Sequence, residues 1–219
     1  MSANLFAIFR RGLPADAATR PFIERPDGSV LTYGDLLDLS GRLANALVEL
    51  GVRPGDRVAA QVEKSPEALM AYLACLRAGA VWLPLNTAYT AGEVRYFLGD
   101  AEPALFLCRP EAEGAMRALA AEVGVPRVAT LGEQSEGSLM ALAEAASPEF
   151  ADVARDADDL AAILYTSGTT GRSKGAMLSH GNLASNAQSL AQAWRFTAED
   201  RLLHALPIAG RDVWCVVGV

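Results

Sequence analysis

Apolar residues along the chain follow two alternating spacings, one typical of helices and one typical of strands. In the first helical segment, leucines recur every three or four positions: Leu36, Leu39, Leu43, Leu47 and Leu50. This spacing predicts an amphipathic helix that Thr32 caps, with Asp35 at its third position, and that Gly51 ends. Short apolar runs predict buried strands at residues 57–62, 80–83, 104–108, 127–131 and 161–165.

Capping and turn residues mark the segments between these runs. Ser65-Pro66 predicts a helix that runs to Gly79, and Thr90 with Glu93 has the spacing of a capping box that begins a helix to about residue 98. A further helix is predicted at 111–122, and the turn at 26–29 predicts a hairpin between 22–24 and 30–31. Residues 132–138 and 145–159 are interpreted as polar linkers. Strands that alternate with helices predict an α/β fold, in which helices flank a parallel-rich sheet.

One polar stretch, residues 165–175, differs from the other turns. It reads Tyr-Thr-Ser-Gly-Thr-Thr-Gly-Arg-Ser-Lys-Gly and joins the predicted strand 161–165 to a second one at 176–178. Its glycines permit positive φ angles and close backbone approach, and its hydroxyls, backbone N–H groups and Lys174 are donors. This combination suits a polyanion such as a triphosphate. It is not the common phosphate loop, because that loop ends in Gly-Lys-Ser/Thr.

Composition narrows the class of protein. The chain has 219 residues, of which 51% are hydrophobic and 21% charged, so it can bury a core. Its net charge of −7 argues against a nucleic-acid binder, which needs a basic surface. The three cysteines, Cys75, Cys108 and Cys215, form no CxxC pair, which argues against a zinc site or a disulfide scaffold. The apolar start at 1–9 is too short for a secretory signal, and no run is long enough to span a membrane, so we expect a cytoplasmic protein.

The stretch at 165–175 resembles the signature of the adenylate-forming, or AMP-binding, enzymes. This family contains acyl-CoA synthetases, nonribosomal peptide adenylation domains and luciferases. Residues 165–171 match the usual motif, as do Lys174 and Gly175, whereas Ser173 stands where proline is usual. Further similar segments, which extend the resemblance over most of residues 20–207, are 31–36, 51–58, 76–86 and 178–183. The variant at 85–90 is most similar to malonyl-CoA and related acyl-CoA synthetases.

The resemblance implies an activity, a site and a domain. Members of the family activate a carboxylate with ATP, and many pass the acyl group to coenzyme A. It implies that Mg²⁺ enters with ATP, and that the partners are a small-molecule carboxylate, ATP and CoA. Residues 1–219 would be an incomplete N-terminal AMP-binding domain whose C-terminal domain is absent. The residues that would contact the β- and γ-phosphates are Thr166, Ser167, Gly168, Thr169, Thr170, Gly171 and Lys174.

Two alternatives to a working ligase stay open. The later family motifs have no counterpart in this sequence, so the chain could instead be an inactive nucleotide-binding fragment or pseudo-enzyme. For the same reason we assign no catalytic or metal-binding residue. The second alternative is an α/β-hydrolase, because residues 171–175 also match the G-x-S-x-G nucleophile elbow through Ser173.

The sequence gives simpler expectations for the histidines and for three arginines. We interpret His180 as a residue at the start of a helix, and His204 as a packed core residue in a strand-like run. Their spacing does not suit a metal site. We expect the helical arginines Arg42, Arg77 and Arg95 to lie on solvated faces.

Overall fold

The computed structural model describes residues 2–166 and 173–204. The helices in this part of the chain are α1 (Leu5–Arg11), α2 (Tyr33–Glu49), α3 (Pro66–Arg77), α4 (Ala91–Ala101), the short 3₁₀ helix η1 (Pro110–Ala112), α5 (Glu113–Glu122), α6 (Ser138–Ala145) and α7 (His180–Trp194). The strands are β1 (Pro21–Glu24), β2 (Val30–Thr32), β3 (Arg57–Gln61), β4 (Val81–Pro84), β5 (Leu105–Cys108), β6 (Val128–Thr130), β7 (Leu160–Thr166) and β8 (Lys174–Ser179).

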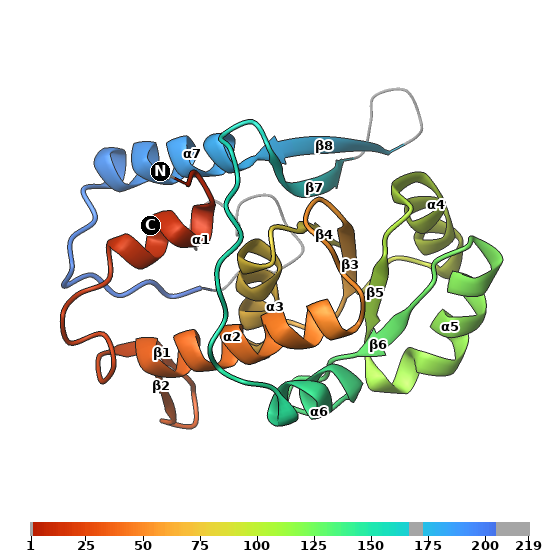
Figure 1. Cartoon of the computed structure of the whole chain (residues 1–219), viewed down its shortest axis with the longest axis horizontal. Helices are drawn as coiled ribbons and strands as arrows, with labels where there is room; N and C mark the ends of the chain where they lie inside the picture. Colours follow the sequence, from red (N-terminus) through yellow and green to blue (C-terminus); the bar gives the residue numbers. More distant parts are fainter. Residues whose placement is uncertain (1, 167–172, 205–219) are drawn as a thin grey trace.

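A six-stranded sheet forms the centre of the fold, with the strand order β6-β5-β3-β4-β7-β8 (Figure 1). Strands β3 to β7 pair in parallel, and β8 runs antiparallel to β7 at the edge. Strands β1 and β2 form the predicted hairpin. The prediction of an α/β fold with a mostly parallel, helix-flanked sheet is confirmed.

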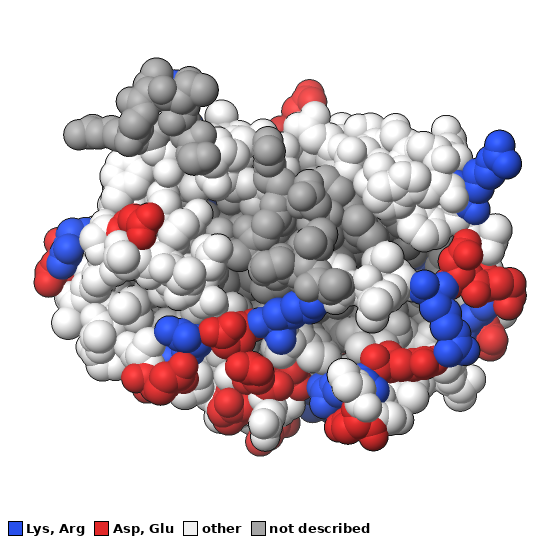
Figure 2. Space-filling view, turned by 180° about the vertical axis from the view of Figure 1, so that it is seen from behind, with Lys and Arg blue, Asp and Glu red and all other residues white. Residues whose placement is uncertain are grey.

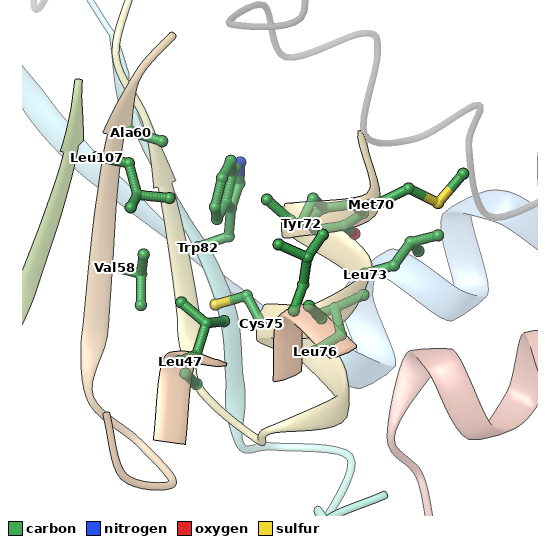
Figure 3. Packing of buried hydrophobic residues seen from close by; sticks show 14 of the residues in the cluster. Leu47, Val58, Ala60, Met70, Tyr72, Leu73, Cys75, Leu76, Trp82 and Leu107 are labelled. Carbon is green, nitrogen blue, oxygen red and sulfur yellow. The ribbon is translucent and has the colours of Figure 1, made fainter. Parts of the chain in front are cut away.

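The two faces of the sheet build two apolar clusters, because successive strand residues point to opposite sides. On one face, Val58, Trp82 and Leu107 pack against α2, α3 and α6. Figure 3 shows side chains of α3, including Tyr72, directed toward Trp82 in this cluster. On the other face, Phe106 and its neighbours pack against α4 and α5.

Three helix starts follow the predicted caps. The Thr32 side chain accepts from the N–H of Asp35, and Thr90 and Glu93 form the expected capping box. Gly51 and Gly79 have φ angles of +82° and +69° just after their helices, a region that glycine enters without strain. The larger differences from the predicted helix bounds are that α4 continues to residue 101, and that η1 begins the segment that was predicted as one helix at 111–122.

The segment predicted as a linker at 145–159 packs against the domain. It crosses α2 and α3 on its way from α6 to β7 (Figure 1). Arg77, which we expected on a solvated face, is only 3% exposed and anchors this segment. Its guanidinium pairs with Asp152 at 2.7 Å and donates to the Phe150 carbonyl at 3.2 Å. The expectation was wrong because the crossing segment covers the face of α3 that carries Arg77. Arg95 on α4 is exposed as expected, and Arg42 is half-buried beside Asp38.

The N-terminal residues are joined to distant parts of the chain. The amide of Asn4 donates to the carbonyls of Leu76 and Val153, at 2.7 and 2.9 Å. The N–H of Leu5 donates to Nδ1 of His180 at 3.1 Å. Among the helices described, none is long and apolar enough to cross a membrane.

The cysteines that the structure describes are buried free thiols. Cys75 lies on α3 and Cys108 ends β5. Burial raises the pKa of the Cys108 thiol to about 11, so it stays protonated at neutral pH. Cys215 lies outside the described residues.

Candidate phosphate-binding site

The predicted polyanion loop joins the carboxyl end of β7 to the start of β8. Thr166 is the last residue of β7 and Lys174 the first of β8, and the two are paired in register. The structure therefore brings these two predicted site residues together at the base of the loop. The other predicted site residues, at 167–171, lie outside the described part of the chain.

Lys174 is available to an anion. Its side chain is exposed, and no described carboxylate lies within ion-pair distance of its ammonium. Many of the described arginines differ from Lys174, because they form ion pairs with carboxylates. Arg95, for example, pairs with Glu122 at 2.7 Å. On the face of the molecule that Figure 2 shows, Lys and Arg side chains lie among Asp and Glu side chains along the lower border, whereas few charged side chains lie along the upper border. Lys174 therefore offers, at the described base of the loop, a positive charge that no described carboxylate neutralises.

Both stems of the loop contact helix α4. The Tyr165 hydroxyl donates to Oδ2 of Asp100 at 2.5 Å, and the Tyr96 hydroxyl donates to the carbonyl of Ser173 at 2.9 Å. Burial, followed by the hydrogen bond to Asp100, raises the pKa of Tyr165 well above its usual value. Tyr165 is thus a neutral donor across the physiological range. Sequence reasoning missed Tyr96 and Asp100, because nothing local to α4 indicates that it lies beside the loop.

Gly175 permits close packing within the second stem. A Cβ atom at this position would lie 2.9 Å from Cγ2 of Ile163 and 3.6 Å from the ring of Tyr165. A larger residue would therefore push β8 away from β7 at the base of the loop. The packing of the stem gives a reason for glycine at this position.

The hydrolase alternative is not supported by the geometry. A nucleophile elbow places its serine between a strand and a helix. Ser173 instead directly precedes strand β8, and its carbonyl is engaged by Tyr96. Ser173 therefore lacks the setting of a nucleophile elbow.

The contacts of the two histidines are with neighbouring parts of the chain. His180 is the first residue of α7, as predicted, and is fully buried with Nδ1 occupied by the N–H of Leu5. His204 is only half-buried, and residues 201–204 form no strand, so the expectation of a core strand residue was wrong. Its carbonyl accepts from the ammonium of Lys64. Within the described residues, no group of three or more His, Cys, Asp or Glu side chains could hold a metal ion.

Comparison with known proteins shows the family of the chain. The family model for "AMP-binding enzyme" matches residues 13–211, nearly the whole chain. The chain belongs to the AMP-binding enzyme family. The solved structure of ATP-bound MatB from Rhodopseudomonas palustris is 54% identical, with a TM-score of 0.94 over all of this chain and 43% of the MatB chain.

Other members of the AMP-binding family are more distant. A feruloyl-CoA synthase from an Amycolatopsis species is 38% identical over 84% of this chain. An oxalate–CoA ligase from Arabidopsis thaliana is 36% identical over 81% of this chain. The chain spans about 35% of the length of each of these two relatives.

Proposed function

We propose that the chain is the nucleotide-binding part of an ATP-dependent carboxylic acid–CoA ligase. The observation that carries the proposal is the pairing of Thr166 and Lys174 at the base of a loop with the family signature. This hairpin belongs to a chain that superposes on ATP-bound MatB with a TM-score of 0.94. In this proposal the residues that bind the β- and γ-phosphates are Thr166, Ser167, Gly168, Thr169, Thr170, Gly171 and Lys174.

The proposed reaction has two steps. A carboxylate oxygen attacks the α-phosphorus of ATP, the bond from that phosphorus to the bridging oxygen breaks, and pyrophosphate leaves. The sulfur of CoA then attacks the acyl carbon, the thiol loses its proton, and AMP leaves. In the first step, negative charge accumulates on the departing pyrophosphate, and the Lys174 ammonium with nearby hydroxyls would stabilise it.

Mg²⁺ would arrive with the nucleotide. As the family resemblance implies, we place the ion on the phosphates of ATP. When bound there, it neutralises part of the phosphate charge. The protein's own contribution is then to hold the triphosphate in one position through donors at the loop, with Lys174 as a fixed positive charge.

The proposed acid is a small dicarboxylate, with malonate first. The sequence at 85–90 resembles malonyl-CoA and related synthetases, and one relative at 36% identity is an oxalate–CoA ligase. We place this activity in the cytoplasm and in fatty acid metabolism. A test set of malonate, oxalate, ferulate and a long-chain fatty acid, supplied to a longer protein containing this chain, would check the substrate proposal. Preference for the fatty acid would contradict it.

Lys174→Ala tests the nucleotide site directly. We expect the 219-residue chain to bind ATP at about millimolar Kd, and the variant to bind about fivefold more weakly or worse, because it loses an exposed ammonium that no described carboxylate neutralises. The matched control is Lys64→Ala, since Lys64 is the only other lysine and donates to a carbonyl elsewhere. Calorimetric titration with ATP measures both, and equal affinities in the two variants would contradict the proposal.

ATP–pyrophosphate exchange, measured on a longer protein that contains this chain, separates the ligase from the alternative of an inactive nucleotide-binding protein. For the 219-residue chain we expect nucleotide binding without acyl-CoA formation. Positioning of the acyl group against the α-phosphate can contribute roughly 7–11 kcal/mol to lowering the barrier, and we expect residues beyond this chain to provide it. Acyl-CoA product from the purified chain that disappears in Lys174→Ala would overturn this expectation.

A further inference from the structure

Helix α4 contacts both stems of the β7–β8 loop through two residues one helical turn apart. Tyr96 and Asp100 are four positions apart, so they lie next to each other on one face of the helix. Tyr96 donates to the carbonyl of Ser173 in the second stem. Asp100 accepts from the hydroxyl of Tyr165 in the first stem. We call this pair of hydrogen bonds the α4 clamp.

The rings of the α4 clamp also pack together. The centroid of Tyr165 lies 4.4 Å from that of Phe97 and 6.3 Å from that of Tyr96, the latter in an edge-on arrangement. Such contacts between aromatic rings add to the burial of their surfaces. The two tyrosine rings that donate these hydrogen bonds are therefore already held beside each other, which lowers the entropy that the bonds must overcome.

Helix α4 itself is firmly placed. Val94, Phe97 and Leu98 are almost fully buried in the cluster beneath the sheet. The capping box of Thr90 and Glu93 fixes the start of the helix. The side chains of Tyr96 and Asp100 thus keep a constant position relative to the sheet. Through the α4 clamp they hold the two loop stems in a constant position as well.

We propose that Tyr96 and Asp100 are positioning residues for phosphate binding: they hold the two stems of the loop against α4 at a fixed separation. This inference rests on the proposed function, because it assigns the stems to a phosphate-binding loop. Neither residue contacts the nucleotide in this proposal. Both act through Ser173 and Tyr165, which flank the loop on either side.

The main test is Tyr96→Phe, with Tyr89→Phe as the matched control. Tyr89 belongs to the same aromatic group, with its ring 4.9 Å from that of Phe97, but its hydroxyl has no hydrogen bond to the loop stems. Tyr96→Phe removes one hydroxyl and keeps the ring. We expect faster amide hydrogen exchange in a peptide spanning 160–179 in Tyr96→Phe and unchanged exchange in Tyr89→Phe.

The second readout is specific to phosphate. Loss of one hydrogen bond predicts about a threefold to tenfold rise in the Kd for ATP in Tyr96→Phe. The affinity for adenosine, which carries no phosphate, should not change. A general loss of folding would weaken the binding of both ATP and adenosine, and it would also lower the melting temperature of the protein.

Asp100 offers a graded test of the other stem. Asp100→Ala removes the acceptor of Tyr165, and it should not weaken α4, because alanine favours helix and the negative charge near the helix end is lost. Asp100→Asn keeps an acceptor oxygen. We expect Asp100→Ala to weaken ATP binding and Asp100→Asn to restore most of it.

The outcomes separate this inference from the proposed function. If Tyr96→Phe and Tyr89→Phe exchange at the same rate, the α4 clamp does not hold the loop and the inference is wrong. If exchange quickens in Tyr96→Phe while ATP affinity stays the same, the positioning role is wrong. If the unaltered chain binds no ATP, the proposed function fails and the positioning role fails with it, whereas the exchange rates still report whether the clamp exists.

Discussion

At the scale of single residues, His180 shows how burial sets the charge of a side chain. Its imidazole is fully buried, and Nδ1 accepts from the N–H of Leu5, so Nε2 carries the proton of the neutral ring. Burial lowers the pKa of His180 to about 4, helped by the positive charge of Arg155 and opposed by Asp159. A protonated His180 would place a second donor against the Leu5 N–H, so acid should weaken the attachment of the N-terminal segment.

His180→Asn should make the protein less sensitive to acid. An unfolded histidine takes up its proton near pH 6.5 and the folded one near pH 4, so the unfolded state binds more protons between these values. Stability is therefore full above pH 6.5 and falls as the pH drops towards 4, by about 2–3 kcal/mol at pH 4.5. Asparagine can still accept from Leu5 but does not titrate.

Urea unfolding of both proteins at pH 7.5 and 4.5 measures the difference. Other titrating groups are common to the two proteins, so they cancel when the acid-induced losses are subtracted. An equal loss in His180→Asn and in the unaltered chain would show that His180 does not contribute to the acid sensitivity.

Sequence predicted the residues whose role is local and missed those whose partners are remote. Thr32 and Thr90 cap helices through neighbours three positions away, so the pattern alone identified them. His180 was correctly placed at a helix start, but its partner Leu5 lies 175 positions away. Of the candidate site, Thr166 and Lys174 came from the signature, whereas Tyr96 and Asp100 depend on how α4 packs.

At the scale of elements, the contact between α2 and the segment at 146–159 is unusually close. A Cβ atom at Gly41 would lie 1.9 Å from the backbone carbonyl oxygen of Pro148. Asn45, one turn later, donates to the carbonyls of Ser147 and Glu149 at 2.8 and 3.0 Å. The acidic, polar composition of this segment predicted a linker, because composition does not report backbone carbonyls that dock on a helix.

Gly41→Ala should destabilise the protein although alanine is the better helix former. The gain in helix propensity is about 1 kcal/mol, and the clash with a backbone atom should exceed it, for a net loss of roughly 2 kcal/mol. Gly99→Ala in α4 is the control, since its nearest atom would be Cγ1 of Val123 at 3.9 Å, an ordinary contact. Thermal unfolding should show a lower midpoint for Gly41→Ala and an equal or higher one for Gly99→Ala. The same shift in both would refute the close approach at Gly41.

At the scale of the whole molecule, Arg77 joins four parts of the chain. From α3 its guanidinium donates to the Leu37 carbonyl and the Ser40 hydroxyl of α2, at 2.9 and 2.8 Å. It pairs with Asp152 of the crossing segment and lies 4.8 Å from the ring centre of Phe6 in α1. The family resemblance predicted the fold class and the family correctly, but it did not reveal this connection, because the partners meet only in the folded chain.

Arg77→Met should cost about 3–5 kcal/mol of unfolding free energy, because it removes the buried guanidinium that binds Asp152, the Leu37 carbonyl and the Ser40 hydroxyl together. Arg10→Met is a matched control, since Arg10 pairs with the same carboxylate at 3.1 Å but is 52% exposed. Such an exposed pair contributes about 1 kcal/mol or less. Urea denaturation compares the two, and losses of similar size would show that burial of Arg77 adds nothing.

The position of β7 in the sheet has a consequence for the order of folding. Trp82 of β4 pairs with Ala162 of β7, which is far away in the sequence. The pairs among β3, β4, β5 and β6 join residues that are closer together in the sequence. Pairings between distant positions close long loops and therefore form slowly. The four strands from β3 to β6 can assemble first, and the β7–β8 hairpin would be added to their edge afterwards. In a newly made chain, Thr166 and Lys174, the described residues of the proposed phosphate site, would then be among the last to take their place.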